Sequence, residues 1–267
     1  MRNDATLSKS SRHTLNHLLS KGLLFTVASA RSVFTIREVI KGVNLTLPMI
    51  EINGAFVTDM ASGEHLVINA IKPALLPELY ACINRHNAFS IIATFDGSRD
   101  RLYYDHAHNK GIEKAVENRK AANDPRLCQL NDLEQAFDDQ VVSFTVIGLE
   151  DCLDPLNEEI EQEYNSAISA HYFKDIYSEF HWLTIQDKKA SKDNAIKAIM
   201  EEKGLSGCEI VAFGDNDNDL PMLKTAHRAI AVENATDALK KNATQIIGSN
   251  QEQSVVAYLE EDFIPPK

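Results

Sequence analysis

The stretch EIVAFGDNDNDLPML, residues 209–223, joins a short apolar run to a loop with three aspartates on alternate positions. The run EIVAF (209–213) is typical of a buried strand, and Pro221 is placed to open a helix after the loop. Two further apolar runs of strand length, AIAV (229–232) and TQIIG (244–248), follow with a helical segment between them. This alternation of apolar strands and helices predicts a parallel sheet covered on both faces.

The N-terminal part of the chain shows the same alternation. We expect a helix near residues 8–22, a strand at LLFTVA (23–28), a helix over 32–41 and a strand at PMIEI (48–52). A hairpin over residues 55–70 then closes this part of the chain.

Residues 73–184 break the pattern. Strand-like runs follow each other here without a helix between them, as in FSIIATF (89–95) and RLYYD (101–105), and helical stretches such as 151–169 lie between such pairs. This arrangement is typical of a mixed α+β sheet. We therefore predict an α/β protein: a Rossmann-like parallel core formed by 1–72 and 185–267, split by an inserted α+β domain at 73–184.

Composition and charge narrow the class of protein. The chain has 267 residues, of which 44% are hydrophobic and 25% charged, as in folded globular proteins. Its net charge of −12 argues against a nucleic-acid binder. No apolar run is long enough to cross a membrane, and residues 1–10 lack the apolar core of a secretory signal, so we expect a cytoplasmic location. The four cysteines form no Cys-x-x-Cys pair, which favours reduced thiols.

The aspartate loop allows three interpretations. A calcium loop starting at Asp215 would need glycine at its sixth position and glutamate at its twelfth, but Leu220 and Ala226 stand there. A solvated turn is common for Asp and Asn. However, the loop follows a predicted parallel strand, where open α/β sheets bind ligands, and its oxygen-rich side chains suit Mg²⁺. We therefore favour a metal site.

Four motifs in order resemble those of the haloacid dehalogenase superfamily, in the Cof-type subgroup of phosphatases. The pattern Gly-Asp-x-x-Asn-Asp-x-x-Met (214–222) resembles the fourth motif of that family, and VASAR (27–31) resembles the second. INGA (52–55) resembles the Asn-Gly-Ala that follows the next core strand in that family, and DKKASKDNAIKAI (187–199) resembles the third motif. The resemblance spans nearly the whole chain and implies that 73–184 is a cap domain over a hydrolase core.

The resemblance also implies roles for individual residues. The predicted catalytic residues are Lys192, which would bind phosphate, and Asp215, which would bind Mg²⁺. Asp219 is predicted in the metal site, where it and Asn218 would hydrogen-bond to waters, Lys192 or the phosphate. The predicted substrate-binding residues are Ser29, Arg31, Asn53, Gly54, Lys192 and Asn218. Each has an ordinary alternative: a strand-end serine is commonly a helix cap, and a lysine that opens a helix is usually on the surface.

The sequence departs from the family pattern at three places. Ala30 and Asp193 stand where the family commonly has glycine. The larger departure is that the chain contains no Asp-x-Asp-Gly-Thr, whose two aspartates are the family's nucleophile and general acid/base, and Asp4 is no substitute. We expect that the assigned start is an internal methionine or that the chain is truncated, so that the first core strand is missing. A catalytically inactive protein is the alternative.

The resemblance implies Mg²⁺-dependent hydrolysis of a small phosphorylated metabolite, such as a sugar phosphate or a phosphorylated cofactor, through a phospho-aspartate. A binding protein that retains Ser29, Lys192 and Asp215 for phosphate or metal is the alternative. A dehydrogenase is disfavoured because no Gly-x-Gly-x-x-Gly follows the first predicted strand. His106 and His108 are expected in a solvated or substrate-facing loop rather than in a metal site. The sequence leaves the substrate and the oligomeric state open.

Overall fold

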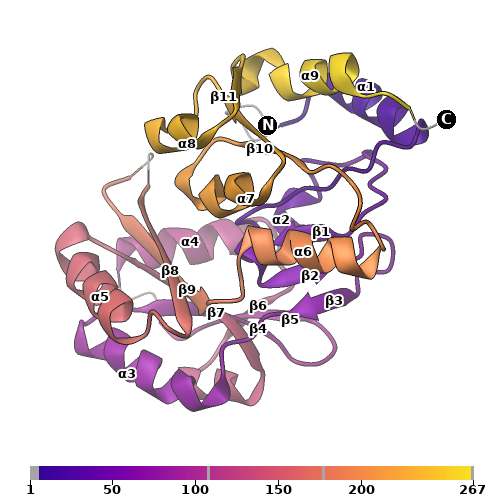
Figure 1. Ribbon diagram of the computed structural model, residues 1–267. Coiled ribbons are helices and arrows are strands. Elements are labelled where there is room, and N and C mark those ends of the chain that lie inside the picture. The colour runs from indigo at the N-terminus through magenta and orange to yellow at the C-terminus, as the bar shows by residue number, and fades with distance from the viewer. Residues whose placement is uncertain (1–5, 107–108, 176–177, 266–267) are drawn as a thin grey trace. The chain divides into compact units, whose positions relative to one another are not determined.

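The computed structural model describes residues 6–106, 109–175 and 178–265 (Figure 1). The chain divides into two compact units. The first, called the outer unit here, is formed by residues 1–67 and 191–267, and the second, the inserted unit, by residues 68–190. The α/β fold class predicted from the sequence is confirmed, since both units combine sheets with helices.

A parallel three-stranded sheet lies in the outer unit, in the order β10–β11–β12. Its strands span Val211–Gly214, Arg228–Val232 and Gln245–Ile247. The helices of the outer unit are α1 (Lys9–Ser20), α2 (Val33–Ile36), α6 (Lys192–Glu202), α7 (Leu220–Thr225), α8 (Asp237–Asn242) and α9 (Ser254–Asp262). Buried alanines on β10 and β11 let Leu223 and Leu239 pack closely on the sheet, which accounts for the apolar strands seen in the sequence.

A second sheet of the outer unit has the order β1–β2–β3, with strands Met49–Glu51, Phe56–Thr58 and His65–Ile68. The predicted strand at 23–28 is wrong: its only strand pairing among the described residues is a parallel bridge between Ala28 and Ile50. Leu23 and Phe25 instead pack against the cluster of α1 and α9. The apolar pattern indicates that these side chains are buried. Side chains can be buried by packing against helices without any pairing between strands.

The predicted helix at 32–41 is also too long, because α2 ends at Ile36. Several β-branched residues in this segment disfavour a helix, and the remainder forms turns that end at Gly42, whose φ is +79°. The predicted helix at 151–169 is too long at its end. Ile168 already begins a strand, where it pairs with Asp187.

The inserted unit contains a six-stranded mixed sheet in the order β6–β5–β4–β7–β9–β8. All neighbouring pairs are antiparallel except β5 and β6, as expected for the mixed sheet. Its strands are β4 (Ser90–Phe95), β5 (Asp100–Tyr104), β6 (Leu127–Gln129), β7 (Gln140–Gly148), β8 (Ile168–Lys174) and β9 (His181–Asp187). The helices are α3 (Leu76–Arg85), α4 (Lys110–Ala121) and α5 (Glu150–Glu163). A continuous apolar core joins α3 and α5 to the central strands β4, β7 and β9.

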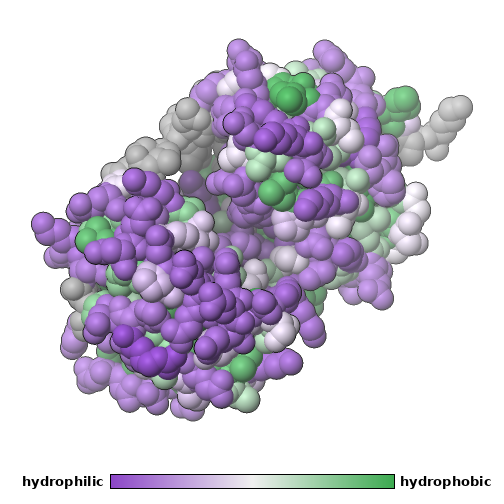
Figure 2. Space-filling view, turned by 60° about the vertical axis from the view of Figure 1, so that its left-hand side comes forward, coloured by the Kyte–Doolittle hydropathy of each residue, from purple (hydrophilic) through white to green (hydrophobic). Residues whose placement is uncertain are grey.

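The face of the molecule in Figure 2 is mostly hydrophilic, with apolar residues scattered over it, as the high charge content implies. Over the described ranges, no helix combines the length and the apolar character that crossing a membrane requires. All four cysteines are free thiols.

Candidate active site

Ser29 lies where the chain leaves its short parallel contact with β1. Its backbone N–H donates to the Ile50 carbonyl at 2.9 Å, and its carbonyl accepts from the Asn53 N–H at 2.9 Å. The Ser29 hydroxyl oxygen accepts the N–H of Arg31 at 3.0 Å. These bonds fix the turns that begin at Ser29 and Asn53 against each other. The Arg31 residue itself is exposed.

Lys192 is a buried cation at the start of α6, with only 5% of its surface exposed. Its Nζ donates to Asp219 Oδ1 at 2.5 Å. Asp219 is the last residue of a short helical turn, Asp217–Asp219, that follows β10. Asp219 is also 5% exposed. A buried lysine needs such a partner, because removing an isolated charge from water is costly. The ordinary alternative of a surface lysine is therefore wrong.

Asp219 also organises the aspartate loop. Its second carboxylate oxygen, Oδ2, accepts the backbone N–H groups of Asp215 at 3.0 Å and Asn216 at 3.3 Å. Both oxygens of Asp219 are thus engaged by protein donors. The residue ties the loop's start to Lys192, so the loop has a fixed backbone rather than the freedom of a solvated turn.

Asp215 is exposed at the surface, whereas Asp219 is buried. Desolvation by the surrounding protein and the negative charge of Asp219 both raise the pKa of Asp215, and the positive charge of Lys192 opposes them. A carboxylate that is disfavoured as a free anion is stabilised by a bound cation. The oxygen of Asp215 is also the hard type of ligand that Mg²⁺ prefers, so the chemistry of the loop fits that ion.

Asn53 and Gly54 connect this loop to the turn at Ser29. Asn218 Nδ2 donates to Asn53 Oδ1 at 3.1 Å. Gly54 has a φ of +102° and approaches the backbone of Ser191, the residue before Lys192. The structure therefore joins the predicted residues Ser29, Asn53, Gly54, Lys192, Asp215, Asn218 and Asp219 through direct contacts.

Replacing Gly54 by alanine is expected to destabilise the protein by about 3 kcal/mol or more. The new Cβ would lie 2.5 Å from the Ser191 carbonyl oxygen, and the positive φ adds strain. The matched control is Gly63→Ala, because Gly63 has a φ of +78° but no neighbour within 4 Å. Chemical denaturation would measure both variants, and equal losses of stability would show that the close approach to Ser191 does not matter.

Glu51 is a buried residue at the edge of this site that the sequence did not single out. Its side chain is fully buried, with Oε2 accepting the Val33 N–H at 2.5 Å and Oε1 accepting the Thr58 hydroxyl at 2.5 Å. It therefore holds the segment after the Ser29 turn against β1. A signal was available, because an acid within the apolar run 48–52 can be buried only with partners.

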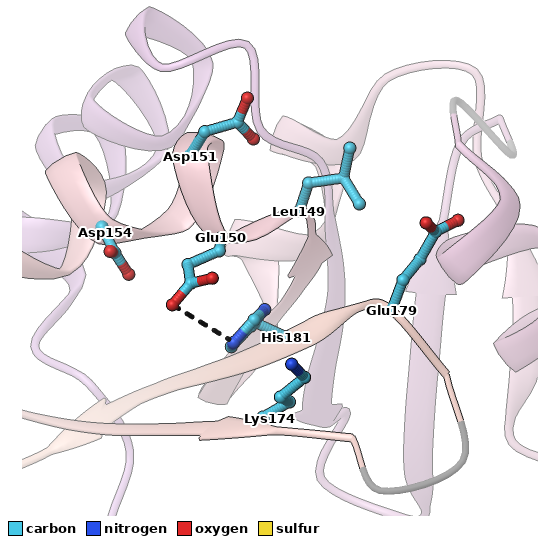
Figure 3. A pocket seen from close by; sticks show the side chains of 7 residues that line it. All are labelled: Leu149, Glu150, Asp151, Asp154, Lys174, Glu179 and His181. Carbon is cyan, nitrogen blue, oxygen red and sulfur yellow. Dashed lines mark ion pairs between the residues drawn. The ribbon is translucent and has the colours of Figure 1, made fainter.

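A pocket of about 450 Å³ lies elsewhere, in the inserted unit. Figure 3 shows several carboxylates around it, with Glu150 facing His181 at 4.0 Å. None of the residues predicted from the sequence lines it, and its acidic lining would repel a phosphate. His106 is exposed on the loop after β5, while His108 lies outside the described residues.

Comparisons with known proteins identify a family for this chain. A family model described as haloacid dehalogenase-like hydrolase matches residues 1–259. The 5-amino-6-(5-phospho-D-ribitylamino)uracil phosphatase YitU of Bacillus subtilis is 24% identical over 269 residues, covering 98% of this chain and 93% of YitU.

Solved structures of low identity share the fold. TM0651 from Thermotoga maritima superimposes with a TM-score of 0.77 at 24% identity, covering 99% of this chain and 94% of that one. The sugar phosphatase BT4131 superimposes with a TM-score of 0.73 at 16% identity, covering 96% of this chain and 92% of that one.

Proposed function

The chain belongs to the haloacid dehalogenase-like hydrolase family and is a phosphatase by that membership, and we propose that it hydrolyses a small phosphorylated metabolite with the help of Mg²⁺. The observation that carries this proposal is the position of Asp215 at the start of a loop that the buried pair Lys192–Asp219 holds in place. A carboxylate with a raised pKa beside a buried ammonium group suits a site that takes a cation and an anion together.

Three charged residues of the outer unit would have different roles in the reaction. Asp215 would hold Mg²⁺ directly, and Asp219 would act on the metal indirectly, by orienting the loop. When bound, Mg²⁺ supplies positive charge that offsets the repulsion between carboxylates and phosphate. Lys192 would place its ammonium group against phosphate oxygens.

The remaining predicted residues would line the phosphate. The Ser29 hydroxyl, the turn at Asn53 and Gly54, the Asn218 amide and the exposed Arg31 would supply donors to phosphate oxygens. Two contacts support this grouping: the Asn53–Asn218 bond and the packing of Gly54 on Ser191. The inserted unit, 68–190, would serve as a cap that selects the substrate and excludes water during the reaction.

The substrate class is proposed from the related proteins. YitU is named for a phosphorylated ribitylamino-uracil, and BT4131 is described as a sugar phosphatase. Both names indicate phosphate monoesters on a polyol or sugar. We therefore propose a sugar phosphate or a phosphorylated cofactor as the substrate. The first aspartate of an Asp-x-Asp-Gly-Thr motif, which these 267 residues do not contain, would attack phosphorus and displace the alcohol, and water would then hydrolyse the acyl phosphate.

One observation favours a second candidate function. The 267 residues contain no Asp-x-Asp-Gly-Thr, which carries the attacking carboxylate and the acid/base in the family pattern. A protein in which Lys192 and Asp215 act without such a pair would bind phosphate and metal and would not hydrolyse a substrate. The alternative is therefore a phosphate- and metal-binding protein without catalytic activity.

The test uses this chain with a panel of sugar phosphates and phosphorylated cofactors. Phosphate release is measured with Mg²⁺, with EDTA, and for the Asp215→Asn variant. Turnover that needs Mg²⁺ and Asp215 would establish the phosphatase and would contradict the expectation that the nucleophile is missing. Saturable binding of inorganic phosphate and Mg²⁺ without turnover would support the binding protein. Failure to bind either would overturn both functions.

A further inference from the structure

A cysteine, a histidine and a glutamate converge within the inserted unit, and we propose that Cys82, His86 and Glu159 form a Zn²⁺ site. One possible ligand atom from each residue lies within 4.8 Å of the others. Cys82 lies on α3 and Glu159 on α5, while His86 is the residue that ends α3. The site is separate from the residues proposed for phosphate hydrolysis, which all belong to the outer unit.

The positions of the three residues on the helices favour binding of one metal ion by all of them. Cys82 and His86 are four residues apart, so their side chains leave the same face of α3. Glu159 faces them from α5, where its Oε2 is 2.7 Å from His86 Nε2. A tetrahedral Zn²⁺ with bonds of 2.0–2.3 Å needs its ligand atoms about 3.5 Å apart, so side-chain shifts of roughly 1 Å would suffice.

The chemistry of the three groups selects the metal. A thiolate, an imidazole and a carboxylate are the usual ligands of Zn²⁺, whereas Mg²⁺ and Ca²⁺ require oxygen ligands. The thiolate of Cys82 and the carboxylate of Glu159 bring two negative charges to the ion, and Glu159 shares its charge with Arg85. Binding would release the Cys82 thiol proton to solvent and would replace the His86–Glu159 hydrogen bond by two bonds to the metal. The proton on Nε2 of the neutral His86 ring would move to Nδ1 by exchange with solvent, which frees Nε2 for the ion.

The residues around the cluster would orient Glu159 and would leave one coordination position of the ion open. Arg85 pairs with Glu159 Oε1, which leaves Oε2 directed at His86. Cys82 is fully buried, while the side chains of His86 and Glu159 are 21% and 24% exposed. The ion would therefore enter from the side of His86 and Glu159 and would keep a water as its fourth ligand. It would clamp α3 to α5.

The test is metal binding by the full chain, with Co²⁺ as the spectroscopic probe and Zn²⁺ as the competitor. We expect a sulfur-to-cobalt charge-transfer band in the near ultraviolet that saturates with one equivalent of Co²⁺ at this site and that Zn²⁺ removes. The Cys82→Ala and Glu159→Gln variants should weaken binding about 100-fold. Zn²⁺ should also raise the melting temperature of the wild-type chain more than that of Cys82→Ala.

Two controls make the assignment specific. Cys152→Ala removes a second thiol, which lies on α5 itself, and it should leave the band unchanged. The Sγ of Cys152 lies 3.4 Å from the His86 carbonyl oxygen. Asp215→Asn should also leave it unchanged. A wild-type chain that gives no charge-transfer band would overturn the proposal, and so would a band that survives in Cys82→Ala.

Discussion

Asp215→Asn is expected to weaken the binding of Mn²⁺, used as a paramagnetic substitute for Mg²⁺, by at least about 100-fold. The variant removes the negative charge that we assign as the direct metal ligand and keeps the size of the side chain. Any Mg²⁺-dependent phosphate release should fall by a similar factor or more. Electron paramagnetic resonance of free Mn²⁺ would measure the affinity without relying on turnover.

The stability of this variant separates metal loss from misfolding. Desolvation and the negative charge of Asp219 raise the pKa of Asp215 in the folded protein. Ionisation of Asp215 at neutral pH therefore destabilises the metal-free fold, and protonation at low pH removes this effect. Removing the charge should therefore leave the metal-free melting temperature unchanged or slightly higher. A clear drop would mean that Asp215 is structural.

The matched control for Asp215 is Asp217→Asn in the same loop. Asp217 is exposed and accepts the Thr236 hydroxyl at 2.5 Å. We expect Mn²⁺ affinity to change less than about threefold, because a solvated charge contributes only through screened attraction. If both variants lose affinity equally, the metal is held by the overall charge of the loop and not by Asp215.

Lys192→Met is expected to destabilise the protein by about 3–5 kcal/mol, because it leaves the carboxylate of Asp219 buried without its cation. Lys192 and Asp219 are each 5% exposed, and the two residues make one direct ion pair. A loss of this size corresponds to a fall of roughly 10 °C in the melting temperature. Denaturant titration followed by circular dichroism would measure it.

The control is Lys197→Met on the same helix, where Lys197 pairs with Asp193 at 3.1 Å and its side chain is 61% exposed. That change should cost no more than about 0.5 kcal/mol. Adding Asp219→Asn to Lys192→Met should recover part of the loss, since the unpaired charge disappears. Additive losses in the double variant would rule out a strong coupling between Lys192 and Asp219.

The strands of the parallel sheet could be predicted from the sequence because their apolar runs are short, continuous and separated by caps and turns. Residues 211–214, 228–232 and 245–247 form that sheet as expected. The same reasoning failed at 23–28. An apolar run reports only that side chains are buried, and there the burial comes from packing against α1 and α9.

The sequence by itself determined the family, through four motifs in order. It also predicts a metal site at the aspartates that follow β10. Only the tertiary structure decided which of these residues meet. Lys192 reaches Asp219 across 27 positions, and Asn53 reaches Asn218 across 165. Local pattern encodes helix, strand and turn through propensity and hydrophobic period. Contacts between distant positions depend on how the elements pack, and in that packing the buried lysine meets its carboxylate.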